Sequence, residues 1–184
     1  MSSSMADVSS GIPAWAKISD RRRSHIERVA VLLRDWAGRL DVDGHELDRW
    51  LRGAYLHDTL KDAPEDELRR LAGPLFDHPQ LLHGPAAAEM ARAHGEQDQG
   101  VLDAIRYHSV GYAGWNQTGR MLYLADYLEP GRRMPVTQRA ERVARVPASP
   151  AAVLREVAQE RIIVALSSGK PLLEQTVAFW NALV

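Results

Sequence analysis

The segment from Asp43 to Lys61, DGHELDRWLRGAYLHDTLK, decides how this chain folds and where its chemistry lies. Asp43 is followed three positions later by Glu46, which is the capping-box pattern of a helix start. The apolar residues of the segment then recur at helical spacing, and Asp58 falls on their face of the helix. We therefore expect a helix that carries the carboxylate of Asp58 into the core.

The adjacent pair His57 and Asp58 is the chemically informative part of this segment. A buried carboxylate needs a cation or several hydrogen-bond donors, because an unpaired buried charge costs several kcal/mol. His57 stands about 100° further round the same helical turn, close enough for both side chains to bind one ion. The pair alone is weak support for a metal site, since Asp58 could equally form an ion pair with Lys61.

Further residues place metal-binding groups among apolar neighbours. His25 shares the inner stripe of its predicted helix with Val29, and Asp126 lies inside the apolar segment 122–128. Each could singly be a hydrogen-bonded core or loop residue. Together they indicate a metal site. The complete predicted ligand set is His25, His57, Asp58, His83, His108 and Asp126.

The donor atoms of this set suggest which metals would bind. The chain contains no cysteine, so disulfides and thiolate sites are excluded. Four imidazoles and two carboxylates suit Fe, Mn, Zn, Co or Ni and argue against an all-oxygen Mg²⁺ or Ca²⁺ site. Six ligands exceed the needs of one tetrahedral ion and fit two ions that share a carboxylate and leave positions open for water and substrate.

The rest of the chain predicts an all-α fold, because its apolar pattern is helical nearly throughout and no stretch alternates as a strand would. We expect one helical domain over residues 18–184 and a disordered or loosely packed tail over residues 1–17. The expected helices cover approximately residues 20–40, 43–60, 64–73, 85–94, 98–108, 120–128, 137–144, 150–166 and 171–183.

The composition and charge of the chain argue against two classes of binding partner. Charged residues make up 26% of the 184, but the formal net charge is only −1. This balance gives little reason to expect nucleic acid or an anionic membrane as a partner. The first residues lack the pattern of a signal peptide, and no stretch approaches the length of a membrane span. We therefore expect a cytoplasmic protein without membrane association.

Two other features were weighed as ligand sites. The segment Ser167-Ser168-Gly169-Lys170 resembles the end of a phosphate loop, but it lacks the leading glycine, and Pro171 stands where Ser or Thr is needed. We therefore reject it as a phosphate loop. Tyr112 and Trp115 lie on a polar loop just after His108, where they could stack on a nucleotide base or merely anchor the loop.

Several motifs, taken in order, resemble a known family. The chain is similar from about Ile18 to about Ala144 to the YqeK family of HD-domain proteins, which are bacterial symmetrical diadenosine tetraphosphate (Ap4A) hydrolases. LLHG and LADYLEPGR are the more specific motifs, whereas HD alone would indicate only the superfamily. The motifs that carry the resemblance are Leu56–Lys61 (LHDTLK), Leu81–Gly84 (LLHG), Ala104–Gly111 (AIRYHSVG) and Tyr123–Arg132 (YLADYLEPGR).

The resemblance implies a dinuclear centre, commonly occupied by iron, that splits Ap4A into two ADP molecules. By position, one metal would be held by His25, His57, Asp58 and Asp126, and Asp58 would bridge to a second metal held by His83 and His108. The segment His108-Ser109-Val110-Gly111 and the loop after it depart from the usual family form. This departure puts the substrate preference in doubt, but not the ligands.

We expect hydrolysis by a hydroxide formed from water on the two divalent or trivalent ions, with iron the first choice and Mn, Co, Ni or Zn as alternatives. Asp58, Lys61 and Asp62 are assigned catalytic roles, with Asp62 orienting water or Lys61. The predicted substrate contacts are Lys61, Tyr112, Trp115 and Arg132, of which Lys61 and Arg132 would clamp phosphates.

Three functions compete at this stage. The first is symmetrical hydrolysis of a dinucleoside polyphosphate. The second is hydrolysis of another nucleotide, such as a nucleoside monophosphate or a guanosine alarmone. The third is a non-catalytic helical module that retains the ligands, against which the full ligand set argues. The protein could also form a homodimer, which the sequence does not decide.

Overall fold

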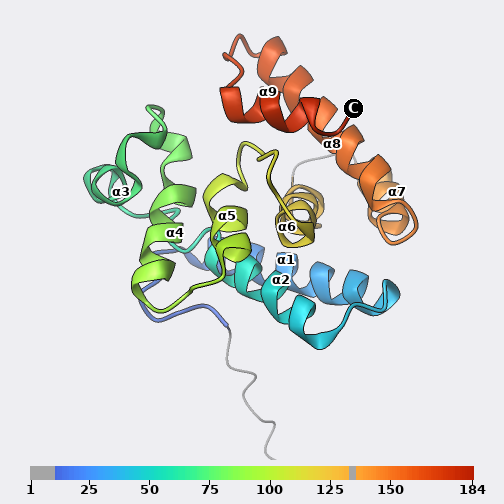
Figure 1. Cartoon of the computed structure of the whole chain (residues 1–184), viewed down its shortest axis with the longest axis horizontal. Coiled ribbons are helices and arrows are strands. Elements are labelled where there is room, and N and C mark those ends of the chain that lie inside the picture. Colours follow the sequence, from blue (N-terminus) through green and yellow to red (C-terminus); the bar gives the residue numbers. More distant parts are fainter. Residues whose placement is uncertain (1–10, 133–135) are drawn as a thin grey trace, which may run out of the picture.

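The computed structural model describes residues 11–132 and 136–184, and within these ranges it contains only helices and connecting loops (Figure 1). The expected all-α fold class is confirmed. The α-helices are α1 (Asp20–Arg39), α2 (Gly44–Leu56), α3 (Glu65–Ala72), α4 (His83–Ala93), α5 (Gln99–Tyr107), α6 (Gln117–Leu128), α7 (Val136–Arg145), α8 (Pro150–Ser167) and α9 (Glu174–Asn181), with short 3₁₀ helices η1 (Gly73–Leu75) and η2 (Pro79–Leu81).

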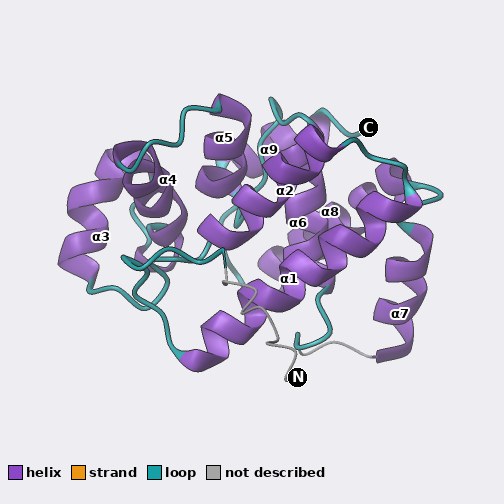
Figure 2. Cartoon of the chain, turned by 90° about the horizontal axis from the view of Figure 1, so that it is seen from below, coloured by secondary structure: helices purple, strands orange, loops and turns teal. Residues whose placement is uncertain are grey.

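Helix α6 lies at the centre of the fold. Its side chains are buried nearly all round, which is the pattern of a helix surrounded by others rather than of a surface helix. It packs against α1, α2, α5, α7 and α8. In both views α3 and α4 lie at one end of the molecule and α7 at the other (Figures 1 and 2). The polar residue Asp126 on this central helix is thus surrounded by other helices.

The predicted helix starts at Asp43 and Asp98 are confirmed. The Asp43 side chain accepts a hydrogen bond from the Glu46 N–H, and Asp98 accepts from the N–H groups of Gly100 and Val101. Each cap satisfies N–H groups that have no partner within the helix. At the start of α1, the side chain of Ser19 makes no capping hydrogen bond.

The end of α2 differs from the prediction, because the helix stops at Leu56 rather than near residue 60. The Thr59 hydroxyl donates to the carbonyl of Leu56 at 2.8 Å, and the Lys61 N–H donates to the carbonyl of Asp58 at 3.0 Å. Such local bonds compete with a continuing helix. The His-Asp pair therefore lies in a tight turn that begins where α2 ends.

The described part of the expected N-terminal tail is attached to this turn. The Lys17 N–H donates to the carbonyl of Thr59 at 2.7 Å, and the Asp62 N–H donates to the carbonyl of Lys17 at 3.3 Å. Trp15 stacks on His94 with 5.3 Å between ring centroids. Residues 11–17 are therefore packed on the helical body, and residues 1–10 of the expected tail lie outside the described residues.

Two further helix starts differ from the prediction. Helix α6 begins three residues earlier than expected, because Asn116 caps it by accepting from the N–H of Gly119. Helix α9 begins only at Glu174. None of the described helices combines the length and apolar character that crossing a bilayer would require.

Gly84 lets α4 approach α5 closely. A Cβ atom added at Gly84 would lie 2.8 Å from the carbonyl oxygen of Arg106 and 3.0 Å from that of Ile105. We expect Gly84→Ala to lower the free energy of unfolding by about 1–3 kcal/mol, because two backbone segments would have to separate. Urea-induced unfolding measures this change.

The matched control is Gly38→Ala in α1, where an added Cβ meets nothing within 4 Å. It should leave the free energy of unfolding unchanged or raise it by up to about 1 kcal/mol, since alanine favours a helix more than glycine does. A Gly84→Ala protein as stable as the wild type would contradict the close approach of α4 and α5.

Candidate metal centre

The six residues predicted as metal ligands converge at one place in the fold. They come from α1, the turn after α2, the first residue of α4, the residue after α5, and the central helix α6. All are buried, with exposed fractions between 0% and 5%. They are His25, His57, Asp58, His83, His108 and Asp126.

The first group of donor atoms surrounds one position. Nε2 of His25 lies 3.1 Å from Oδ1 of Asp126 and 3.3 Å from Nε2 of His57. Oδ2 of Asp58 lies 3.6 Å from the Nε2 atoms of both His25 and His57. Ligands bound at about 2.1 Å to one ion lie roughly 3.0–3.4 Å apart when adjacent, so these separations suit a shared metal.

The second group uses the other oxygen of the same carboxylate. Oδ1 of Asp58 lies 3.2 Å from Nε2 of His83 and 3.4 Å from Nε2 of His108. The two Nε2 atoms are themselves 3.1 Å apart. The Asp58 carboxylate therefore faces one group of ligands with each oxygen, which is the geometry of a carboxylate bridging two ions.

Backbone carbonyl groups orient two of the imidazoles. Nδ1 of His57 lies 2.7 Å from the oxygen of Ala54, and Nδ1 of His108 lies 2.8 Å from the oxygen of Ile105. A carbonyl only accepts, so the proton resides on Nδ1 and the Nε2 lone pair points inward. The buried Oδ1 of Asp58 accordingly has no hydrogen bond of ordinary geometry. Imidazole lone pairs that converge on a carboxylate oxygen without a donor favour a cation between them.

Burial and charge hold these groups in the forms that bind metals. Burial is the main cause that lowers the pKa of His57 to about 3 and that of His83 to about 4. Both imidazoles are therefore neutral at pH 7. Burial alone would raise the pKa of Asp58, but neighbouring histidines hold it well below the usual range. Arg132 and the histidines do the same for the pKa of Asp126. Neutral imidazoles and ionised carboxylates fit a transition-metal centre.

Glu129 supports the site from outside, and sequence reasoning missed it. Its carboxylate is buried, lies 3.0 Å from Nδ1 of His25, and accepts from Nε of Arg28 at 2.5 Å and from the Gly131 N–H at 2.6 Å. Burial lowers the pKa of His25, but hydrogen bonds to Asp126 and Glu129 outweigh it and the net shift is upward. A carboxylate behind a metal-binding histidine fixes the ring and makes it a stronger ligand.

Two arginines bind the carboxylates of the site directly. Nη1 of Arg22 donates to Oδ2 of Asp58 at 2.5 Å, and Nη2 of Arg132 donates to Oδ1 of Asp126. Arg132 was predicted at this place, whereas sequence reasoning did not assign Arg22 to the site. Their guanidinium groups can bind phosphate oxygens in a bidentate manner.

The predicted catalytic residues Lys61 and Asp62 have different surroundings. Nζ of Lys61 lies 3.2 Å from both ring nitrogens of His83, so it is part of the cluster. Burial lowers the pKa of Lys61. The carboxylate of Asp62 instead accepts the N–H of Ser19, the residue before α1, at 2.8 Å. This contact gives Asp62 a structural role and provides no support for the predicted role in orienting water.

The prediction that Trp115 stacks on a base is wrong. Trp115 is only 4% exposed, packs edge-on against Phe179, and donates from Nε1 to the carbonyl of Asp103 at 3.0 Å. Tyr112 stacks on Tyr107 with 4.5 Å between ring centroids, which occupies one face of its ring. Phe179 of α9 packs on Trp115, so these aromatic residues anchor the loop.

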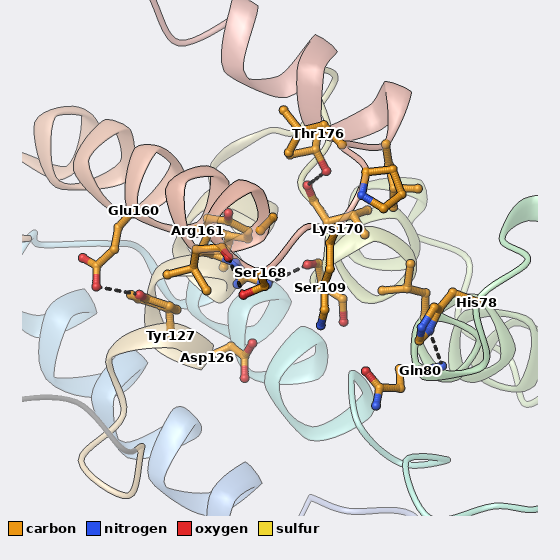
Figure 3. Close-up of a pocket in the computed structure, with 18 of the residues that line it drawn as sticks. His78, Gln80, Ser109, Asp126, Tyr127, Glu160, Arg161, Ser168, Lys170 and Thr176 are labelled. Atoms are coloured by element: carbon orange, nitrogen blue, oxygen red, sulfur yellow. Dashed lines mark hydrogen bonds between the residues drawn. The ribbon is translucent and has the colours of Figure 1, made fainter.

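A cavity of about 700 Å³ adjoins the metal ligands (Figure 3). Asp126 and Arg132 line it on one side, together with Ser109, which follows His108. The remaining walls come from η2, α8, the connection after α8 and the start of α9. Pockets of this size commonly bind a small molecule of nucleotide size.

The bridging position of Asp58 predicts how metal content responds to mutation. Asp58→Ala should remove both metals, because it removes the one group that faces both sets of imidazoles. Asp126→Ala should lose the metal on the His25 side preferentially and retain about one per chain. Elemental analysis of the purified proteins, with folding checked by circular dichroism, measures both.

The matched control is Asp62→Ala, which removes a nearby aspartate whose side chain accepts the Ser19 N–H before α1. It should retain the full metal content. Wild-type metal content in Asp58→Ala would contradict the bridging arrangement.

Comparisons with known proteins agree with this site. The chain matches the HD domain family over residues 22–131, a region that contains all six clustered residues. It is 27% identical over 176 residues to the symmetrical bis(5'-nucleosyl)-tetraphosphatase of Bacillus subtilis, covering 91% of this chain and 92% of that protein. It is 30% identical over 139 residues to the protein of the same name from Halalkalibacterium halodurans, covering 71% and 73%.

A solved structure shares the fold. The crystal structure of an HD superfamily hydrolase from Clostridium acetobutylicum superposes with a TM-score of 0.79 at 24% sequence identity, covering 90% of each chain. The family match extends over more than half of this chain, and the halodurans relative is covered over more than two thirds of its length. The chain therefore belongs to the HD-domain family, alongside the symmetrical bis(5'-nucleosyl)-tetraphosphatases.

Proposed function

We propose that this protein is a metal-dependent phosphohydrolase that cleaves diadenosine tetraphosphate symmetrically into two molecules of ADP. One observation carries the proposal: the two oxygens of Asp58 face two separate groups of imidazole nitrogens beside a cavity of nucleotide size. The names of the relatives supply the substrate class, a dinucleoside tetraphosphate.

The donor set supports two transition-metal ions, and we propose iron as the first choice, with manganese, cobalt, nickel or zinc as alternatives. When bound, two such ions lower the pKa of a water toward neutrality and so supply a nucleophile at pH 7. Glu129 and the carbonyls behind His57 and His108 hold the imidazoles in place. A fixed geometry of this kind reduces reorganisation during the reaction.

The cations of the site are suited to the phosphate chain. Arg22, Lys61 and Arg132 all lie against the metal-binding side chains. We propose that these three cations bind phosphate oxygens and stabilise the charge that moves toward the leaving group during cleavage. The tetraphosphate carries several negative charges, which makes such a concentration of cations favourable.

We place the enzyme in the cytoplasm, where a chain without cysteine is compatible with reducing conditions.

The products test this proposal. If attack occurs at a phosphorus beside the central bridging oxygen, ADP is the only nucleotide formed from diadenosine tetraphosphate, and anion-exchange chromatography of the reaction should show ADP alone. Asp58→Ala should form no product, because it lacks the group that holds both metals. Equal amounts of AMP and ATP would contradict symmetrical cleavage, and no turnover by metal-loaded wild-type protein would contradict the activity itself.

A further inference from the structure

The cavity beside the metal ligands is completed by residues outside the HD-family region. The family match ends at residue 131, whereas much of the cavity wall comes from α8, residues 168–173 and Thr176 of α9. These elements carry two basic residues of the wall, Arg161 and Lys170 (Figure 3). The metal ligands all belong to the family region, so these two cations are a separate feature of the cavity.

Lys170 reaches the cavity because of the way α8 ends. The Lys170 N–H donates to the carbonyl of Ala165 at 2.9 Å, and Gly169 adopts a φ of 65°. A glycine favours this left-handed conformation, which reverses the chain at a helix C-terminus. The next residue, Lys170, is thereby brought to the cavity wall, and Figure 3 shows its side chain directed inward.

Lys170 differs from the other two lysines of the chain. Lys17 forms an ion pair with Glu67 at 2.6 Å, and Lys61 contacts the ring of His83. For Lys170, no carboxylate of residues 11–132 or 136–184 lies within ion-pair distance. A lysine without an anion in a concave wall is available to bind one from solution.

Arg161 is fixed in place without using a carboxylate. Its Nη2 donates to the carbonyl of Ser109 at 2.6 Å, and its Cζ lies 4.6 Å from the ring centroid of Tyr123. A guanidinium held over an aromatic ring keeps its charge and its other N–H groups for further contacts. The hydroxyl of Ser109 is 3.1 Å from Nε2 of His108, so Arg161 is bonded to a residue that contacts the metal cluster.

The acidic residues of the wall do not neutralise these two cations. Glu160 accepts a hydrogen bond from the Tyr127 hydroxyl at 3.0 Å and forms an ion pair with Arg142. Figure 3 shows Glu160 directed toward Tyr127 at the edge of the cavity. Asp126 contacts Arg132 and His25. The wall formed by α8 and the connection after it therefore presents positive charge.

We propose that Arg161 and Lys170 form a second phosphate-binding position, which holds the phosphates of the substrate that the metal ions do not. This inference rests on the proposed function, because a dinucleoside tetraphosphate has more phosphates than one dinuclear centre binds. Charge-assisted contacts in the same cavity as the metal ligands favour a polyphosphate chain long enough to reach both. The C-terminal helices thus supply substrate specificity to the catalytic region.

ADP binding to metal-loaded protein tests this position without relying on turnover. Lys170→Gln should bind ADP roughly 5- to 20-fold more weakly by calorimetry, as expected for loss of a charged hydrogen bond in a partly exposed site. Lys170→Arg should restore most of the affinity, because it restores the positive charge. Lys17→Gln is the matched control and should bind ADP like the wild type, since Lys17 pairs with Glu67 and does not line the cavity.

Lysine footprinting gives a second, direct readout, because the three lysines are easily resolved by mass spectrometry. Saturating ADP should slow acetylation of Lys170 by an N-hydroxysuccinimide ester and leave that of Lys17 unchanged. If wild-type protein binds ADP and cleaves the tetraphosphate, but Lys170→Gln binds ADP normally or Lys170 is not protected, the phosphate position is refuted and the activity stands. Wild-type protein that neither binds ADP nor cleaves the substrate would refute both.

Discussion

The buried carboxylate of Asp58 is the interaction on which the rest of the site depends. Each of its oxygens faces imidazole nitrogens from a different part of the chain, and one oxygen has no hydrogen bond of ordinary geometry. Arg22 binds the other oxygen, so the atom left without a partner is the one that faces His83 and His108, and a cation there would stabilise it. The close contact at Gly84 and the central position of α6 both bring ligands to this carboxylate.

Sequence reasoning located several of the ligands because they were polar residues at apolar positions of a helical pattern. Asp126 in its apolar segment is an example, and the structure places it on the central helix. Glu129 and Arg22 could not be found in the same way, because their roles depend on partners distant in the sequence. Trp115 was expected to contact the substrate because its loop is polar. In the structure Phe179 of α9, which is distant in the sequence, packs against its ring.

The chain divides its chemistry between two regions. Residues 22–131 carry the metal ligands and match the HD domain family, while α8 and α9 close the cavity. The segment Ser167-Ser168-Gly169-Lys170, rejected as a phosphate loop, has a different role in the structure. Its glycine ends α8 and turns Lys170 toward the cavity. The sequence motif could not predict this position, because the direction of the lysine depends on how the helix ends.

The proposed metal centre requires that Asp58 lies between two metal ions. Anomalous diffraction from crystals of the metal-loaded protein tests it most directly, since it places each ion without reference to activity. A bridging Asp58 should give two peaks about 3.5–4 Å apart, one on each side of its carboxylate. A single peak bound by only one set of imidazoles, or peaks away from this carboxylate, would contradict it.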